Sequence, residues 1–520
     1  MIPFDAGGAF HPRAGTHELR RLAVRSGAAT IGASGLALVA QVISTVILAR
    51  LLTPADFGVV AMVTTFSLLL VSFGLNGFTE AVIQCDEIDH HTASNLFWLN
   101  AGIAAALAVA FAASGSLLGR FFHNPLVPKV AMCMSVGIVI SGASVIHLAL
   151  LKRAMLFVGV SSNDFIGRAV NTVVAIVFAL RGWGYWALAL GIIAQQLSTT
   201  IGAWYLCRWI PGLPRKTGKT GALVWFAAKV FGQFTFGYST SNIDNLLVGW
   251  RFNATVLGSY KKAFDLFALT ASQLTSPLNS VALSALSRLN EDRVRFRRYL
   301  ASSLGMIAFI GMAMSADLTL VGRDVVRLVL GTKWSASGRI FEIFGPGIGA
   351  MLLCSTVGWI HLSIGKPGRW MRWTFIQFVI TTCMFLVALP WGPDGVAAAW
   401  SISFWTLLIP TYWYAGRPIG FGISDLIGAI WKYVAAALVA GGITAGVTRG
   451  TTLWGIPSST SAALGIAFAV SILFISLYLI MVILFYRGLA PLRELARLLS
   501  ELGPSRKNPT PAVEVAGGCE

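Results

Sequence analysis

The sequence predicts an all-α, polytopic membrane protein with about fourteen transmembrane helices. The first observation is composition: 56% of the 520 residues are hydrophobic and 12% are charged, about half the roughly 25% charge of soluble domains. The second is that the chain divides into long apolar stretches, each near the roughly 20 residues that a helix needs to span hydrocarbon. The third is an uneven distribution of its 39 Lys and Arg residues between the gaps. Lipid is therefore the main solvent of this chain.

The predicted spans are bounded by polar or Gly-rich residues. Two of them are the clearest, because the stretches 95–119 and 451–486 carry no charged residue. The gaps are too short to hold an extramembrane catalytic or nucleotide-binding domain. The approximate spans are residues 28–49, 57–79, 93–118, 125–150, 157–180, 184–206, 224–249, 256–286, 299–321, 337–364, 371–390, 395–415, 425–447 and 459–486.

Most basic residues lie in the termini and in the even-numbered gaps, counted from the N-terminus. Loops rich in Lys and Arg stay in the cytoplasm, so we expect the segment 1–27 and the tail 487–520 to be cytoplasmic. Short amphipathic surface helices are predicted at 17–25 and 492–503. The net charge of +18 fits loops that face anionic lipid. It does not indicate nucleic acid, because no domain-sized soluble segment exists to bind it.

The two halves of the chain repeat the same layout of spans. At an offset of 200 residues, Gly58 falls on Gly258 and Ser72 falls on Ser272. Six spans and their repeat keep one orientation, which predicts two lobes related by a pseudo-two-fold axis along the membrane normal. The predicted units are an N-lobe (28–206), a basic cytoplasmic linker (207–223), a C-lobe (224–415) and two extra helices within 425–486.

Motifs of enzymatic chemistry are missing from the sequence. There is no P-loop, and the six cysteines are scattered without a C-x-x-C pair. His90 and His91 lie near acidic residues, but a solvated cytoplasmic turn explains them better than a metal site does. We therefore expect no cofactor, no metal and no catalytic residue, and a protein that is not an enzyme.

Eight segments carry a resemblance to a known family. They are 49–58 (ARLLTPADFG), 74–76 (GLN), 81–84 (AVIQ), 97–100 (FWLN), 244–249 (DNLLVG), 257–260 (LGSY), 277–278 (PL) and 287–289 (SRL). Taken in this order, they resemble the Wzx-type polysaccharide repeat-unit flippases of the multidrug/oligosaccharidyl-lipid/polysaccharide exporter superfamily, over about residues 20–420. One departure is Lys261 followed by Lys262, where the resemblance predicts a small polar residue and then Arg; position 262 keeps its charge but loses bidentate geometry.

The resemblance implies two six-helix lobes around a central cavity that opens alternately to each side of the bacterial inner membrane. It implies a flippase that moves undecaprenyl-diphosphate-linked oligosaccharides from the cytoplasmic to the periplasmic leaflet, for exopolysaccharide, capsule or O-antigen synthesis. Implied partners are that lipid-linked substrate, membrane lipids, and a polysaccharide polymerase with its chain-length machinery. A cation-coupled multidrug antiporter of the same superfamily and a membrane-embedded polysaccharide polymerase are the alternatives.

A flippase of this kind needs cations for the two phosphates, and three basic residues fall inside predicted spans: Arg168, Lys261 and Lys262. Charges within a span are costly and are candidates for function. Asp164 lies four residues before Arg168, on the same helical face. This pair either fixes helix packing or supplies a cavity cation for the diphosphate.

Lys261 and Lys262 lie just inside the eighth span, with Asp265 three or four residues after them. Adjacent residues point about 100° apart on a helix, so one lysine is expected to face the cavity while the other reaches the interface. Asp244 lies in the periplasmic half of the seventh span. It is either a carboxylate that couples transport to a cation or a partner of one of these lysines.

Overall fold

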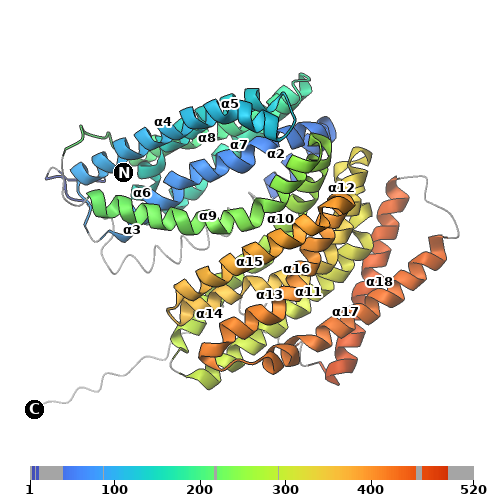
Figure 1. Ribbon diagram of the computed structural model, residues 1–520. Coiled ribbons are helices and arrows are strands. Elements are labelled where there is room, and N and C mark those ends of the chain that lie inside the picture. The colour runs from blue at the N-terminus through green and yellow to red at the C-terminus, as the bar shows by residue number, and fades with distance from the viewer. Residues whose placement is uncertain are drawn as a thin grey trace, which may run out of the picture.

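Long α-helices joined by short turns make up nearly all of the described chain (Figure 1). The protein is seen in a computed structural model, which describes residues 3–5, 7–10, 35, 39–85, 87–215, 220–290, 292–452, 460–489 and 493. Within these ranges, nine helical stretches are long and apolar enough to cross a membrane. The predicted all-α polytopic fold is confirmed. The two surface helices predicted near the termini, at 17–25 and 492–503, lie outside the described residues, apart from residue 493.

The first bundle is coloured blue to green in Figure 1. In it α4 packs along α5, and α7 packs along α8. A helical segment at Val39–Leu51 precedes α2. The elements are α2 (Pro54–Ser72), the π-helix η1 (Phe73–Phe78), α3 (Thr79–Gln84), α4 (His90–Phe121), α5 (Val127–Gly142), α6 (Val145–Arg153), α7 (Phe157–Leu180) and α8 (Tyr185–Cys207).

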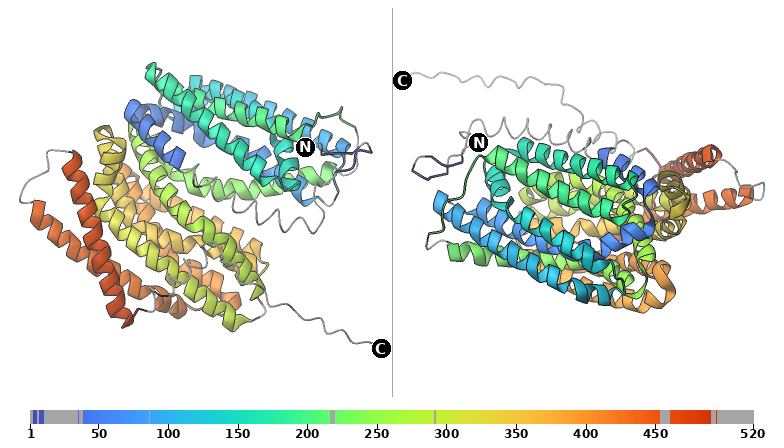
Figure 2. Two further views of the ribbon diagram at one scale, coloured as in Figure 1. Left: turned by 180° about the vertical axis from the view of Figure 1, so that it is seen from behind. Right: turned by 90° about the horizontal axis from the view of Figure 1, so that it is seen from above.

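The second bundle is coloured yellow to orange, and α9 and α10 run between it and the first. Figure 2 shows α17 and α18 at its outer edge, where they pack on α11. The elements are α9 (Thr220–Arg251), α10 (Ala254–Arg288), α11 (Arg293–Leu330), α12 (Ser335–Phe344), α13 (Ile348–Ser355), α14 (Val357–Ser363), α15 (Pro367–Ala388), α16 (Gly392–Gly416), α17 (Ile423–Thr452) and α18 (Thr460–Tyr486).

Each predicted span from residue 57 onward overlaps one helix or a run of consecutive helices. The span predicted at 125–150 is broken between α5 and α6, and the span at 337–364 is divided into α12, α13 and α14. The span at 299–321 is too short, because α11 continues at both ends through charged turns. Asp292 caps its first turn, accepting from the backbone N–H groups of Val294 and Arg295. Hydropathy cannot detect such polar extensions.

The sequence Thr53-Pro54-Ala55-Asp56 predicts a helix start, with Thr53 as N-cap and Pro54 at the first helical position. In the structure a capping box fixes this start of α2. The Thr53 hydroxyl accepts from the Asp56 backbone N–H at 3.3 Å, and the Asp56 carboxylate accepts from the Thr53 backbone N–H at 2.9 Å. Pro54 occupies the first turn, where its missing N–H costs no hydrogen bond. This cap sets the position of α2 at the contact between the bundles.

We expect Thr53→Ala to lower the free energy of unfolding by about 1 kcal/mol, because it removes both hydrogen bonds of the Thr53 hydroxyl with Asp56. Thermal denaturation of the purified protein in detergent measures the change. Thr406→Ala is the control, because its exposed hydroxyl bonds only to carbonyls of its own helix, at Ile402 and Ser403. Equal melting temperatures for the two variants would contradict the proposed contribution of the cap.

The bundles meet at a reciprocal contact of two glycines on α2 and α10. A Cβ at Gly58 would overlap the carbonyl of Ala254, and a Cβ at Gly258 would overlap the carbonyl of Pro54. Gly58 and Gly258 are 200 positions apart in the sequence, and so are Pro54 and Ala254. The pairing predicted from the repeat at these glycines is therefore present in space, as a local two-fold relation.

Contacts around these glycines close the same end of the molecule. The Trp334 indole N–H donates to the carbonyl of Ala49 at 2.8 Å, and Arg50 Nη2 donates to the carbonyl of Leu328 at 3.0 Å. Trp334 is fully buried at this junction. The end of the first bundle that precedes α2 is thus joined to the second bundle by hydrogen bonds as well as by packing.

Candidate functional site

A cavity of about 880 Å³ lies inside the first bundle, and α10 closes one of its walls. Its apolar lining comes mainly from α2, whereas the polar lining comes from several helices. The polar lining residues are Gln41, Ser44, Thr64, Ser141, Ser144, Lys152, Ser161, Asn163, Asp164, Asn171, Gln195, Gln196, Thr199, Lys261, Lys262 and Asp265. The cavity therefore combines carboxamides and hydroxyls with charged groups from the first bundle and from α10.

Arg168 and Asp164 form the predicted pair on α7. Arg168 Nε lies 3.0 Å from Asp164 Oδ2, and Arg168 Nη1 donates to the Gln41 side-chain oxygen at 3.0 Å. Both charged side chains are about half exposed. Because Asp164 and Gln41 line the cavity, the guanidinium is held at its wall. The ion pair of the packing interpretation is thus present, and it borders the cavity in which the other interpretation places the diphosphate.

Lys261 and Lys262 both line the cavity, although they point in different directions on α10. Lys261 Nζ lies 2.7 Å from Asp265 Oδ1. The Lys262 side chain is buried, and its ammonium lies 4.2 Å from the ring centroid of Phe57 on α2. The expectation that only one lysine would face the cavity is not met. Asp265 forms its ion pair with Lys261. The contact that the structure shows for the Lys262 ammonium is the cation–π interaction with Phe57.

Asp244 lies apart from the lining of this cavity. It is buried on α9 and accepts a hydrogen bond from the hydroxyl of Tyr260 at 2.9 Å. Among the described residues, its Oδ1 and both side-chain polar atoms of Asn245 have no hydrogen-bond partner. Four of the six predicted site residues thus line this cavity: Asp164, Lys261, Lys262 and Asp265. Arg168 is joined to the lining through Asp164 and Gln41, and Asp244 lies outside it, bonded to Tyr260.

The polar wall of carboxamides on α7 and α8 was missed in the sequence. The Asn171 amide donates to the side-chain oxygen of Gln195 at 3.0 Å, and the Asn163 amide donates to the carbonyl of Thr199 at 2.9 Å. The Asn and Gln residues spaced within the apolar spans 157–180 and 184–206 were the sequence signal that could have predicted this wall. Lys152 was also missed, because it was assigned to a cytoplasmic gap.

The charges around this cavity favour an anionic ligand. Three lysines line it (Lys152, Lys261 and Lys262), and Arg168 donates to the lining residue Gln41, against the carboxylates of Asp164 and Asp265. Lysine binds phosphate as a compact point charge, and the carboxamides and hydroxyls supply partners for sugar hydroxyls. Among the described residues, no group of three or more His, Cys, Asp and Glu side chains is placed to hold a metal ion.

Comparison with known proteins gives a family and relatives of one kind. The family described as "Polysaccharide biosynthesis protein" matches residues 47–338. The chain is 22% identical over 336 residues to the succinoglycan biosynthesis transport protein ExoT of Rhizobium meliloti, covering 65% of this chain and 68% of ExoT. It is 24% identical over 348 residues to the lipopolysaccharide biosynthesis protein WzxC of Escherichia coli, covering 66% and 67%.

A solved structure shares the fold. The inward closed conformation of the lipid II flippase MurJ superposes with a TM-score of 0.69, covering 88% of this chain and 98% of MurJ, at 16% identity. That likeness concerns the fold. The resemblance stated from the sequence segments is confirmed by these matches. ExoT is named as a transport protein, which agrees with the prediction that this chain is not an enzyme.

Proposed function

Because this chain belongs to the family of polysaccharide biosynthesis proteins, we propose that it is a flippase for a lipid-linked oligosaccharide. The substrate we propose is an oligosaccharide joined through a diphosphate to undecaprenol. It moves from the cytoplasmic to the periplasmic leaflet of the bacterial inner membrane, for assembly of an exopolysaccharide, capsule or O-antigen. Both termini then face the cytoplasm, as the basic residues of the even-numbered gaps require.

The observation that carries this proposal is the buried cation Lys262 at the cavity wall. A buried ammonium is costly unless a partner compensates for its lost hydration. Phe57 supplies only a cation–π contact, worth about 2 kcal/mol when desolvated. A phosphate oxygen would be a stronger partner, because hydrogen bonds between charged groups are roughly twice as strong as neutral ones. Lys261 and Arg168, whose partners are carboxylates, are the secondary ligands.

The alternative of a multidrug antiporter fits this cavity less well. Cationic drugs require an acidic lining, whereas here the cations outnumber the carboxylates. The carboxamides on α7 and α8 also suit the proposed substrate, because they can form hydrogen bonds with its sugar hydroxyls.

Transport by the purified full-length protein in proteoliposomes tests the proposal. The probe is a fluorescent oligosaccharide on a prenyl diphosphate, and a membrane-impermeant reductant bleaches the molecules exposed outside. We expect the diphosphate lipid to exchange between leaflets much faster than in protein-free vesicles. The same oligosaccharide on a prenyl monophosphate should exchange more slowly, because it offers fewer oxygens to the cations. Equal rates with and without protein would refute a flippase for this substrate.

Asp265→Asn is expected to tighten binding of the diphosphate lipid, because it releases Lys261 from its 2.7 Å ion pair. Partly exposed pairs are worth up to about 1 kcal/mol, so the dissociation constant should fall by up to about fivefold. Binding of the fluorescent lipid to protein in nanodiscs measures it. Asp292→Asn is the matched control, since its pair with Arg295 lies outside the cavity. Weaker binding by Asp265→Asn would show that the carboxylate itself contacts the substrate.

A further inference from the structure

A second cavity, of about 610 Å³, lies between α11, α17 and α18. It shares no lining residue with the cavity of about 880 Å³ inside the first bundle. The helices α17 and α18 follow the second bundle and pack on α11 at its outer edge (Figure 2). This cavity is thus separate from the proposed transport path, and an inference about it does not depend on which substrate crosses.

The mouth of this cavity is basic. Arg297 and Arg298 both line it, from the first turns of α11. Arg297 Nη2 lies 2.9 Å from Asp425 Oδ2 on α17, which fixes the guanidinium at the mouth. The ammonium of Lys432 lies 4.3 Å from the ring centroid of Tyr486, another lining residue. The mouth thus holds two arginines with one carboxylate, and Lys432 lies beside the lining residue Tyr486.

Below the mouth, the wall changes from charged to small and then to aromatic residues. On α11 the residues at successive intervals of four are Arg297, Ala301, Gly305 and Phe309. Positions four apart on α17, which faces α11, are Asp425, Ala429 and Tyr433.

A slot between the helices results from the small residues. A Cβ at Gly305 would lie 3.6 Å from the carbonyl oxygen of Ala429, and a Cβ at Gly428 would meet nothing within 4 Å. The rings of Phe309 and Tyr433 lie 5.7 Å apart, centroid to centroid, and close the far end of the slot. The polarity of the cavity thus falls in one direction, from cations to an apolar end.

We propose that this cavity binds an anionic phospholipid of the surrounding leaflet. Its phosphate lies between Arg297, Arg298 and Lys432, and the start of one acyl chain enters the slot beside Gly305. The gradient from basic to apolar matches the two parts of such a lipid. Basic pockets between transmembrane helices on the cytoplasmic side are recognised sites for lipid headgroups. The bound lipid fills space between α11, α17 and α18 that side chains leave open.

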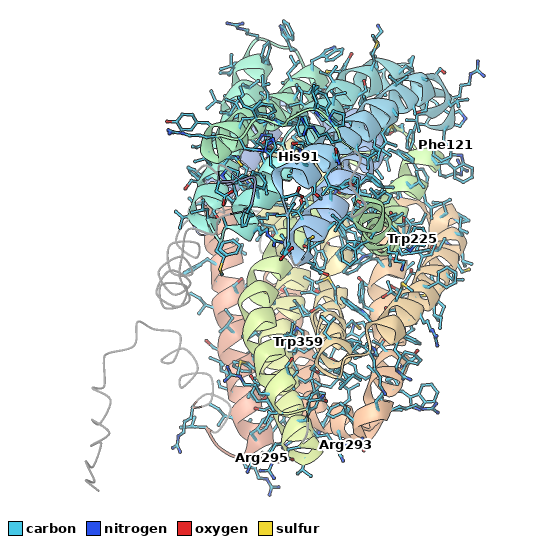
Figure 3. All side chains as sticks on the ribbon, turned by 90° about the vertical axis from the view of Figure 1, so that its left-hand side faces the viewer. His91, Phe121, Trp225, Arg293, Arg295 and Trp359 are labelled. Atoms are coloured by element: carbon cyan, nitrogen blue, oxygen red, sulfur yellow. The ribbon has the colours of Figure 1, made fainter. Side chains whose placement is uncertain are left out.

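Native mass spectrometry of the full-length protein tests this, with phosphatidylglycerol and phosphatidylcholine of matched acyl chains as probes. We expect phosphatidylglycerol to be retained preferentially, and Arg298→Gln to weaken its retention by about fivefold. Arg293→Gln is the control. Arg293 carries the same charge at the start of α11 but does not line the cavity, and Figure 3 shows it near the end of the bundle with Arg295. Equal retention of both lipids, or equal losses in both variants, would overturn the proposal.

A second pair of variants tests the slot without changing charge. Gly305→Leu should fill the slot and reduce retention of phosphatidylglycerol, whereas Gly305→Ala should leave it, because a Cβ there makes only ordinary contacts. Inorganic phosphate in millimolar excess should not displace the lipid. Displacement by phosphate alone, or selective retention of undecaprenyl phosphate over phosphatidylglycerol, would show a different ligand and refute the assignment. Size-exclusion profiles identify any variant that fails to fold.

Discussion

Gly58→Ala and Gly258→Ala are each expected to separate the two bundles at the end where α2 meets α10. Each new methyl group would overlap a backbone carbonyl that cannot rotate away. Overpacking of this kind costs typically about 1–3 kcal/mol. If the closed contact exchanges with an open one, that cost shifts the equilibrium by about 5- to 150-fold toward the open state.

The shift is measured with a cysteine placed beside the contact. Ser259 is buried next to Gly258, and its carbonyl accepts from the Ser337 hydroxyl at 2.8 Å. In Ser259→Cys, a membrane-impermeant maleimide added to whole cells should label the protein slowly. The rate should rise when Gly58→Ala is added. Labelling of the same protein with Ser259 intact gives the background from native cysteines.

Gly102→Ala on α4 is the matched control, because a Cβ there meets nothing within 4 Å. It makes the same chemical change within a helix and should leave labelling of Ser259→Cys unchanged. If Gly58→Ala and Gly102→Ala gave the same rate, the glycine contact would not hold this end closed. Labelling only in inverted vesicles would instead place the contact on the cytoplasmic side and contradict the proposed orientation.

Lys262→Gln is expected to cause the largest loss of substrate binding among the cavity variants. Removing one member of a buried, hydrogen-bonded charge pair costs at least about 2 kcal/mol, which is about thirtyfold in the dissociation constant. The loss follows only if a phosphate replaces Phe57 as the partner of the ammonium. Lys261→Gln should weaken binding less, because Asp265 already neutralises Lys261 in the free protein.

Binding of the fluorescent diphosphate lipid and export of polysaccharide in cells measure the effect. Lys129→Gln is the control, because that lysine is exposed on α5 and does not line the cavity. A melting temperature of Lys262→Gln near that of the unchanged protein would exclude a folding defect as the cause of lost binding. Wild-type binding and export by Lys262→Gln at equal protein levels would remove Lys262 from the site.

Hydropathy and charge predicted the helices and most of the charged site, because both follow from the cost of placing polar groups in lipid. A charge inside a span must face a cavity or a partner, so Arg168, Lys261 and Lys262 could be selected without a structure. The N-cap at Thr53 was predicted as well, since it depends on four consecutive residues.

The partners of these charges could not be predicted, because they come from helices far apart in the chain. Phe57 and Lys262 are 205 positions apart, and Gln41 and Arg168 are 127 apart. Asp265 lies within reach of both lysines by spacing alone, and only side-chain packing assigns it to Lys261. The break between α5 and α6 and the π-helix at Phe73–Phe78 depend in the same way on tertiary packing.

The glycine contact lies one helical turn from the buried lysine. Gly258 precedes Lys262 by four residues on α10, and Gly58 directly follows Phe57 on α2. We therefore expect an anion that draws the ammonium from the ring to change the free energy of closure at the glycines. By thermodynamic linkage, separation of the glycines changes the affinity for the anion by the same factor. Ligand release and opening then share one coupling free energy, and a double-mutant cycle on Gly58 and Lys262 tests for it.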